Sequence, residues 1–119
     1  MTIEQFRALA LSLPEALESA HMGHPDFRVR NKIFATLDYP APGWGMVKVT
    51  LNQQKVLIRE DPEAYIPVKG GWGKRGATTV LLRAAKKAIV LKALTAAWSN
   101  TAPKTLVRNH LDRPDLPRP

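Results

Sequence analysis

The spacing of apolar residues changes twice along this chain, and this change constrains the fold more than any other feature. Apolar residues recur at helical spacing from Ile3 until Pro14, which cannot continue a helix. Between residues 27 and 51 they alternate with polar residues, as in half-buried strands, and helical spacing returns from Ala84 to about Ser99. Strands in the middle with helices on both sides predict an α+β fold: two layers, with a mainly antiparallel sheet and helices packed on it.

Two alternating segments, 27–30 and 32–37, lie so close together that they predict a tight β-hairpin. In the first, Phe27 and Val29 are expected to face the core, and Arg28 and Arg30 the other side. The second is expected to alternate between two faces, with Ile33, Ala35 and Leu37 on one and Phe34 and Thr36 on the other.

The rest of the chain predicts three further strands and two helices. Val47, Val49 and Leu51 alternate with Met46, Lys48 and Thr50 in a third strand. Asn52 is the expected N-cap of a short middle helix that ends at Asp61-Pro62. The segments 65–68 and 78–82 are expected to be extended, and 84–99 the longest helix, with Trp98 in the core. Residues 1–108 are therefore expected to form one domain, followed by a proline-rich tail, 109–119.

The charge of the chain is large and unevenly placed. The sequence has 119 residues and a net charge of +8, from 18 Lys and Arg against 10 Asp and Glu. Residues 1–60 contribute +1 and residues 61–119 contribute +7, and nine basic but no acidic residues lie between Ala64 and Leu111. Such a surface favours a polyanionic partner.

A glycine-rich segment, 70–76, lies within the basic half. Its glycines, the adjacent cations Lys74 and Arg75 and the following threonines are the elements of an anion-binding concavity. The spacing is not that of a nucleotide-binding P-loop, and the segment leads into a strand where such a loop would lead into a helix. The alternative is that the segment binds no ligand and is a flexible turn with solvated cations and a packed Trp72.

Little in the sequence indicates catalysis, a metal or a membrane. The absence of cysteine excludes a disulfide, a Cys-ligated metal and a thiol nucleophile, and no Gly-x-Ser-x-Gly motif is present. His21, His24 and Asp26 lie close in sequence, but we interpret the histidines as structural residues of a turn. We therefore predict no catalytic residue, metal or cofactor. No apolar run reaches the ~20 residues that cross a bilayer, and the first residues do not resemble a signal peptide, so a cytoplasmic protein is expected.

Several segments together resemble a known family. They are residues 21–29, residues 32–37, the strand with Lys48, Pro67 with residues 71–73, Thr79-Val80, and residues 97–98 through 102–104. In order and spacing they are similar to the MmcQ/YjbR family of small bacterial proteins. The resemblance implies an α+β fold with an antiparallel sheet, likened to frataxin-type and secretion-chaperone-like folds. The resemblance also implies DNA binding, which is a frequent label of the family. The family has no agreed catalytic residues that could be assigned to positions of this chain.

These observations predict a non-enzymatic DNA-binding protein that contacts phosphates through the glycine-rich segment and the start of the last helix. The predicted contact residues are Lys69, Trp72, Lys74, Arg75, Arg83, Lys86 and Lys87, joined by Arg28 and Arg30. Trp72 could stack on a base. Two alternatives stay open: a protein-interaction or chaperone-like module for an acidic partner, and a small-anion or nucleotide pocket at the glycine-rich segment. The sequence leaves the oligomeric state undetermined.

Overall fold

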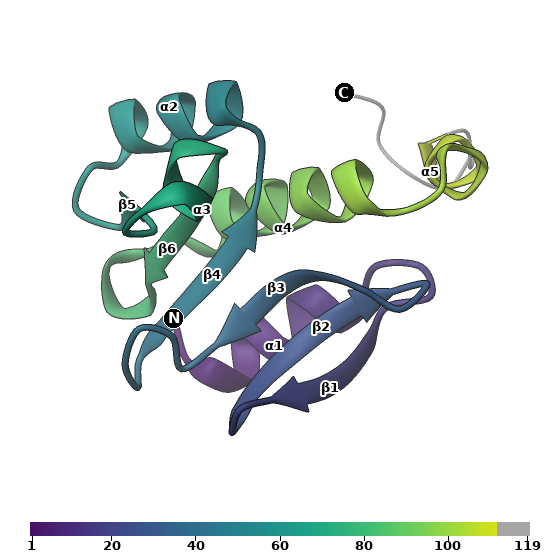
Figure 1. Ribbon diagram of the computed structural model, residues 1–119, viewed down its shortest axis with the longest axis horizontal. Helices are drawn as coiled ribbons and strands as arrows, with labels where there is room; N and C mark the ends of the chain where they lie inside the picture. Colours follow the sequence, from purple (N-terminus) through teal and green to yellow (C-terminus); the bar gives the residue numbers. More distant parts are fainter. Residues whose placement is uncertain (112–119) are drawn as a thin grey trace.

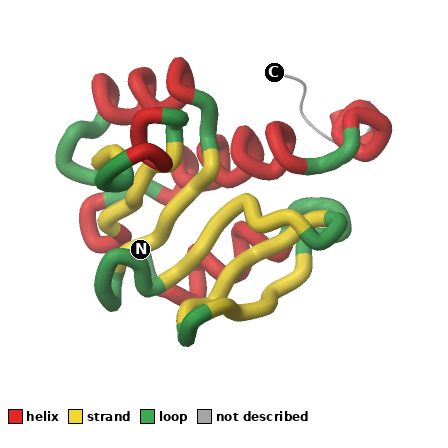
Figure 2. Tube along the Cα trace, viewed as in Figure 1, coloured by secondary structure: helices red, strands yellow, loops and turns green. Residues whose placement is uncertain are grey.

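A six-stranded antiparallel sheet organises the protein, as seen in a computed structural model that describes residues 1–111 (Figures 1 and 2). The strand order is β1-β2-β3-β4-β6-β5, and every neighbouring pair is antiparallel. The strands are β1 (Leu17–His21), β2 (His24–Val29), β3 (Lys32–Leu37), β4 (Trp44–Lys48), β5 (Tyr65–Pro67) and β6 (Ala77–Leu81). The predicted α+β class and the predicted hairpin, β2 and β3, are confirmed.

Two of the helices, α1 and α4, cover one face of this sheet. The helices are α1 (Ile3–Leu11), α2 (Leu51–Glu60), α3 (Gly71–Lys74), α4 (Lys87–Thr101) and α5 (Lys104–Leu111), with a 3₁₀ turn, η1 (Leu82–Ala84). In Figure 1, α1 and α4 lie behind the sheet, where α4 packs on β3, β4 and α1. The core between these layers includes Phe6, Phe27 and Trp98, all fully buried. The Trp98 Nε1–H donates to the Pro14 carbonyl at 3.0 Å, which joins α4 to the segment after α1.

The third strand ends earlier than its alternating pattern predicts, because a capping box begins α2. Thr50, not Asn52, is the N-cap: its hydroxyl accepts from the Gln53 amide at 3.2 Å, and the Gln53 side chain accepts from the Thr50 amide at 2.8 Å. Two of the unpaired donors at the helix start are thereby satisfied. Leu51 is therefore the first residue of α2 rather than the last of a strand.

The predicted faces of Ile33 and Phe34 were wrong because β3 contains a β-bulge. Phe27 pairs with Ala35 while the next residue, Arg28, pairs with Ile33, so Phe34 is the extra residue. Phe34 is fully buried in the core beside Ala35, whereas Ile33 lies on the opposite face. Thr36 keeps its predicted side.

After the long helix, the chain contains a further helix that the sequence did not predict. The long helix begins at Lys87, after η1, and α5 follows it. The first three residues of the expected proline-rich tail, 109–111, continue α5, and the remainder of that tail lies outside the described residues. Among residues 1–111, no helix combines the length and apolar character needed to cross a bilayer.

Candidate functional site

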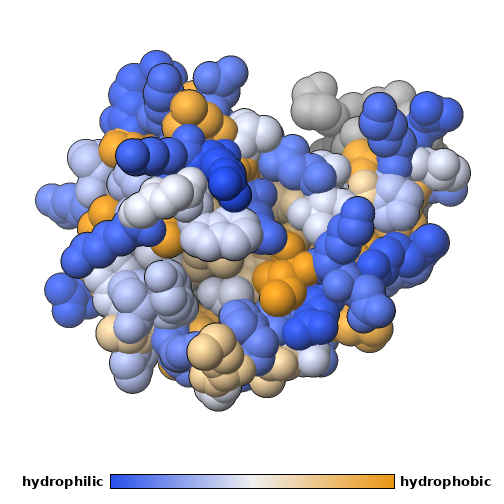
Figure 3. Space-filling model, viewed as in Figure 1, coloured by the Kyte–Doolittle hydropathy of each residue, from blue (hydrophilic) through white to orange (hydrophobic). Residues whose placement is uncertain are grey.

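The sheet face opposite α1 and α4 is open at its centre. The strand register places cross-strand pairs there: His21 with His24, Thr36 with Met46, and Lys48 with Ala77. Figure 3 looks onto this open face and shows apolar and neutral side chains near its middle, surrounded by hydrophilic ones. An exposed apolar patch bounded by polar groups is typical of a binding site.

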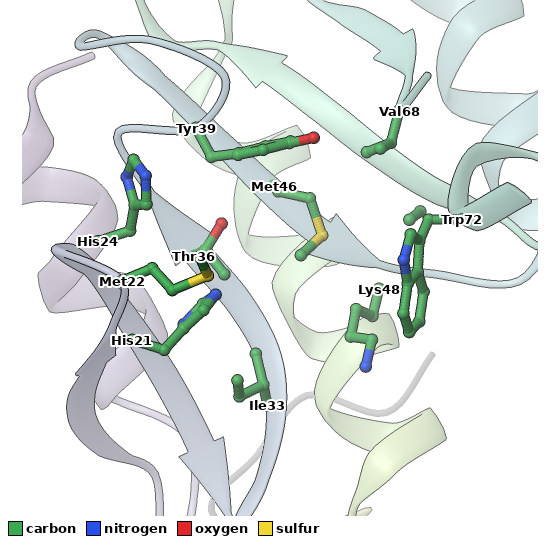
Figure 4. Close-up of a pocket in the computed structure, with 11 residues that line it drawn as sticks. His21, Met22, His24, Ile33, Thr36, Tyr39, Met46, Lys48, Val68 and Trp72 are labelled. Atoms are coloured by element: carbon green, nitrogen blue, oxygen red, sulfur yellow. The ribbon is translucent and has the colours of Figure 1, made fainter. Parts of the chain in front are cut away.

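A cavity of about 450 Å³ occupies this open face (Figure 4). Its floor is formed by Ile33, Thr36 and Met46, and its sides by the β1–β2 hairpin, the loop after β3 and α3. Besides the floor, the residues that line the cavity are His21, Met22, His24, Tyr39, Lys48, Val68, Trp72 and Ala77. Most of this lining is apolar, and the volume lies within the roughly 300–1,000 Å³ of small-molecule sites.

Trp72 is the most prominent side chain at the rim. It is 58% exposed although it is a large aromatic residue. Two cations lie beside its ring: Lys48 Nζ is 5.3 Å and Arg75 Cζ is 5.6 Å from the ring centroid. Both distances are within the range of cation–π attraction. The indole thus lies at the edge of the cavity, next to two positive charges.

Buried contacts fix α3, which carries Trp72. Gln54 of α2 is 4% exposed, and its side-chain amide donates to the carbonyls of Gly73 and Ala77, each at 3.0 Å. At Gly73 the backbone lies so close to Val68 that a Cβ atom would be 1.7 Å from the Val68 carbonyl oxygen. Glycine is therefore required there for close packing, not for flexibility.

The glycine-rich segment is a helical turn rather than an open loop. Its amides at Lys74, Arg75 and Gly76 already donate to the carbonyls of Gly70, Gly71 and Gly73. These three amides are consequently not free to bind an anion. Gly76, at φ +121°, ends the turn where a Cβ would be 2.2 Å from the Val49 carbonyl oxygen.

A second hollow, also of about 450 Å³, adjoins the cavity and is basic. Arg28, Lys32 and Lys48 line it, together with Asn31, Ile33, Asn100 and Thr101. Lys48 and Ile33 line both spaces, so the cavity and the hollow form one continuous surface. No acidic side chain is among the described residues that line either space.

The buried carboxylate of Asp26 organises this side of the sheet. Asp26 is fully buried and accepts from the Arg28 guanidinium at 2.8 and 3.0 Å and from His21 Nδ1–H at 2.8 Å. The Arg28 hydrogen bonds lower the pKa of Asp26 despite its burial, and the His21 bond contributes in the same direction. Arg28 is held against the sheet, and its charge is largely neutralised by Asp26.

The structure brings some of the predicted contact residues together and separates others. Trp72, Lys74 and Arg75 lie in or next to α3, with Lys69 just before it, and their side chains are exposed. Arg83, Lys86 and Lys87 lie beyond the opposite end of β6, at η1 and the start of α4 (Figure 1).

The two predicted arginines of the first hairpin also separate. Arg28 lines the basic hollow, whereas Arg30 lies in the turn after β2 and forms an ion pair with Glu15, Nε to Oε1, at 2.6 Å. The guanidinium of Arg30 lowers the pKa of Glu15. The predicted contact residues therefore do not form a single patch.

Sequence reasoning missed Lys48, Thr36 and Tyr39 as site residues. Alternation in β4 had already placed Lys48 on the face opposite Val47, and this face is open because α1 and α4 cover the other one. Its proximity to Trp72, 24 residues further along the chain, depends on tertiary packing that no local pattern contains. The predicted absence of a metal site stays a prediction, although among residues 1–111 no three His, Asp or Glu side chains group as metal ligands.

Comparisons with known proteins bear on the fold and the family. The YjbR family model matches residues 11–100. A crystal structure of protein DR2400 of Deinococcus radiodurans, whose family-model domain is DUF419, superimposes with a TM-score of 0.68 at 19% identity. The alignment covers 82% of this chain and 75% of that one, and it shows a shared fold. No curated protein matches the sequence. Because the family model covers most of the chain, the protein belongs to the YjbR family.

Proposed function

We propose that the protein binds single-stranded DNA on the open face of its sheet, with Trp72 as a stacking platform. The observation that carries this proposal is the exposed Trp72 ring with Lys48 and Arg75 beside it. Single strands are bound by aromatic rings that stack on bases and by cations that follow the phosphates. Trp72 and its two cations supply both kinds of contact.

A single strand fits this surface better than a duplex does. Bases within a duplex are already stacked on their neighbours, so a tryptophan ring reaches their faces only after a base leaves the stack. The cavity beside Trp72 is mostly apolar and lies on the open face of the sheet, whereas backbone contacts to a duplex need only surface cations.

The remaining predicted cations have a weaker role in this proposal. Lys69 and Lys74 lie next to Trp72 and extend the positive surface around α3. Arg83, Lys86 and Lys87 attract the strand only at longer range, and salt screens exposed charges beyond about 8 Å at physiological ionic strength. We therefore expect the cations at α3 to dominate the affinity.

The test is a fluorescence-anisotropy titration of a labelled oligothymidylate of about ten nucleotides. With about three phosphate contacts, the affinity should fall about twenty-fold between 50 and 200 mM salt. Trp72→Ala should weaken binding about ten-fold or more, since each stacked base contributes about 1–3 kcal/mol. Absence of binding at the lower salt concentration, or unchanged affinity in Trp72→Ala, would contradict the proposal.

Matched charge variants locate the contact surface. Lys48→Ala with Arg75→Ala should weaken binding strongly, whereas Lys86→Ala with Lys87→Ala removes the same charge and should weaken it only about two- to three-fold at physiological salt. Arg108→Ala on α5, also exposed, is the single-charge control. If the Lys86 and Lys87 pair has the larger effect, DNA binds at the start of α4 instead.

An acidic protein is the second candidate ligand. The favouring observations are Met22, which is 92% exposed at the tip of the β1–β2 hairpin, and β1, which is exposed along its whole length at the edge of the sheet. An open edge strand can pair with an extended segment of another protein. Recovery of a stoichiometric acidic protein after nuclease treatment, together with no affinity for oligonucleotides, would favour this candidate over DNA.

A further inference from the structure

Two polar atoms at the cavity lack a hydrogen-bond partner within the protein. They are the Thr36 hydroxyl and His24 Nδ1, both buried, and both residues line the cavity. Thr36 itself is 4% exposed. In Figure 4 the Thr36 hydroxyl points into the space that His24, Tyr39 and Met46 surround. Buried polar groups are nearly always hydrogen-bonded, so these atoms indicate a group that enters from outside.

The walls around these atoms suit a flat, polarisable ring. Met22 and Met46 present thioethers from the hairpin tip and the floor, and Tyr39 and Trp72 present aromatic rings from two other sides (Figure 4). Methionine sulfur and aromatic rings both make favourable contacts with π systems. A planar ring with polar atoms on its edge could satisfy Thr36 while its faces meet this apolar lining.

The charge beside the cavity indicates what such a ring carries. The basic hollow opens next to it, and Lys48 borders both. Because Asp26 neutralises Arg28, the remaining positive charge of the hollow comes from Lys32 and Lys48. A ligand that fills both spaces therefore combines a polar-edged aromatic ring with an adjoining anion, which is the chemistry of a nucleotide.

We infer that the cavity receives one unstacked base of a bound DNA strand, with the Thr36 hydroxyl on the base edge and the adjoining phosphate at Lys48 and Lys32. This inference rests on the proposed function and adds a defined base pocket to it. Trp72 stacks on a neighbouring base at the rim, so the pocket and the platform engage different nucleotides. Every base has donors and acceptors on its edge, and a hydroxyl can serve either, so the pocket should discriminate weakly among bases.

The test separates the base pocket from general strand binding. Two labelled strands of equal length are titrated at low salt: an abasic strand, and the same strand with two adjacent thymine bases at its centre. Wild-type protein should prefer the base-containing strand by at least ten-fold. Thr36→Val, which keeps the side-chain shape but removes the hydroxyl, should reduce affinity for that strand about five-fold and leave the abasic strand unchanged. Thr36→Ser, the control that keeps the hydroxyl, should retain most of the preference.

Each other outcome contradicts the base pocket, the binding of a DNA strand, or both. Equal affinity of Thr36→Val and wild type for the base-containing strand contradicts the pocket but leaves DNA binding intact. Equal binding of the two strands contradicts both the pocket and base stacking on Trp72. No binding of either strand contradicts both proposals. Thymidine monophosphate is the last probe: if it binds as tightly as the strand and depends on Thr36, the ligand is a free nucleotide and the strand proposal fails. Circular dichroism and thermal unfolding confirm that each variant is folded.

Discussion

The two faces of the sheet are built from the same strands but differ in what covers them and in the surroundings of their buried polar groups. On the covered face, Phe27 and Val47 are fully buried against α1 and α4, and Trp98 satisfies its only donor through the Pro14 carbonyl. On the open face, Thr36 is as well buried as many core residues yet lacks a partner. The covered face is closed by α1 and α4, although the core residue Tyr65 also has a buried hydroxyl without a partner. The open face instead borders a cavity, which we propose is filled by a ligand. Variants on the two faces test this difference.

Two tryptophans on opposite faces give the largest contrast. Trp98→Ala should lower the free energy of unfolding by about 3–5 kcal/mol, because it leaves a cavity in the core and removes the bond to Pro14. Trp72→Ala removes an exposed ring and should change stability by less than about 1 kcal/mol. Urea unfolding of the two variants measures both values. A large loss of stability in Trp72→Ala would mean that this ring belongs to the core.

The buried carboxylate on the open face should have an intermediate effect. Asp26→Asn removes the charge that binds Arg28 and His21, and we expect a loss of about 1–3 kcal/mol, moderated because both partners are partly exposed. The pKa of Asp26 is lowered in the folded protein, so its stabilising contribution is present above a pH of about 4 and disappears as the pH falls through the lowered pKa. The stability difference between wild type and Asp26→Asn should therefore shrink on acidification, which urea unfolding at about pH 6 and about pH 3 measures. A difference that grows at low pH would contradict the ion pair.

The anchoring of α3 should affect stability and binding together. Gln54→Ala removes two buried hydrogen bonds to the carbonyls of Gly73 and Ala77, and we expect a loss of about 1–2 kcal/mol in unfolding free energy. Because α3 carries Trp72, DNA affinity should fall as well. Lys55→Ala, the next residue of α2 and exposed, is the control that should leave both measurements near wild type. Unchanged DNA affinity in a destabilised Gln54→Ala would show that Trp72 does not depend on this anchor.

The smallest effect should come from Thr36, and with the opposite sign. Thr36→Val replaces a buried hydroxyl without a partner by a methyl group of the same shape, so unliganded protein should be equally stable or more stable by up to about 1 kcal/mol. Thermal unfolding measures this change. Phe27→Leu on the covered face, by contrast, should lower stability. Destabilisation by Thr36→Val would show that the hydroxyl is already satisfied, for instance by water.

Local patterns predicted most of the strands and helices but missed β1, α3 and α5, and they predicted the site only in part. Alternation placed Val47 inside and Lys48 outside, because a strand covered on one face requires this pattern. It failed at Ile33 and Phe34, where a bulge adds one residue and reverses the faces. The glycine-rich segment was predicted as a loop because glycine is permissive, but Gly73 is needed for close approach to Val68, which depends on tertiary packing. The surface around Trp72 combines residues of α3 and β4, which are distant in sequence, so no local pattern could predict it.

The fixed position of α3 has a kinetic consequence. Gln54 and the close contact at Gly73 hold α3 and Trp72 in place without a ligand, so the proposed DNA binding requires no folding step on the protein side. The association rate should then follow diffusion and the positive field, and it should fall as ionic strength rises. Differences between one bound sequence and another should instead appear in how long each complex lasts.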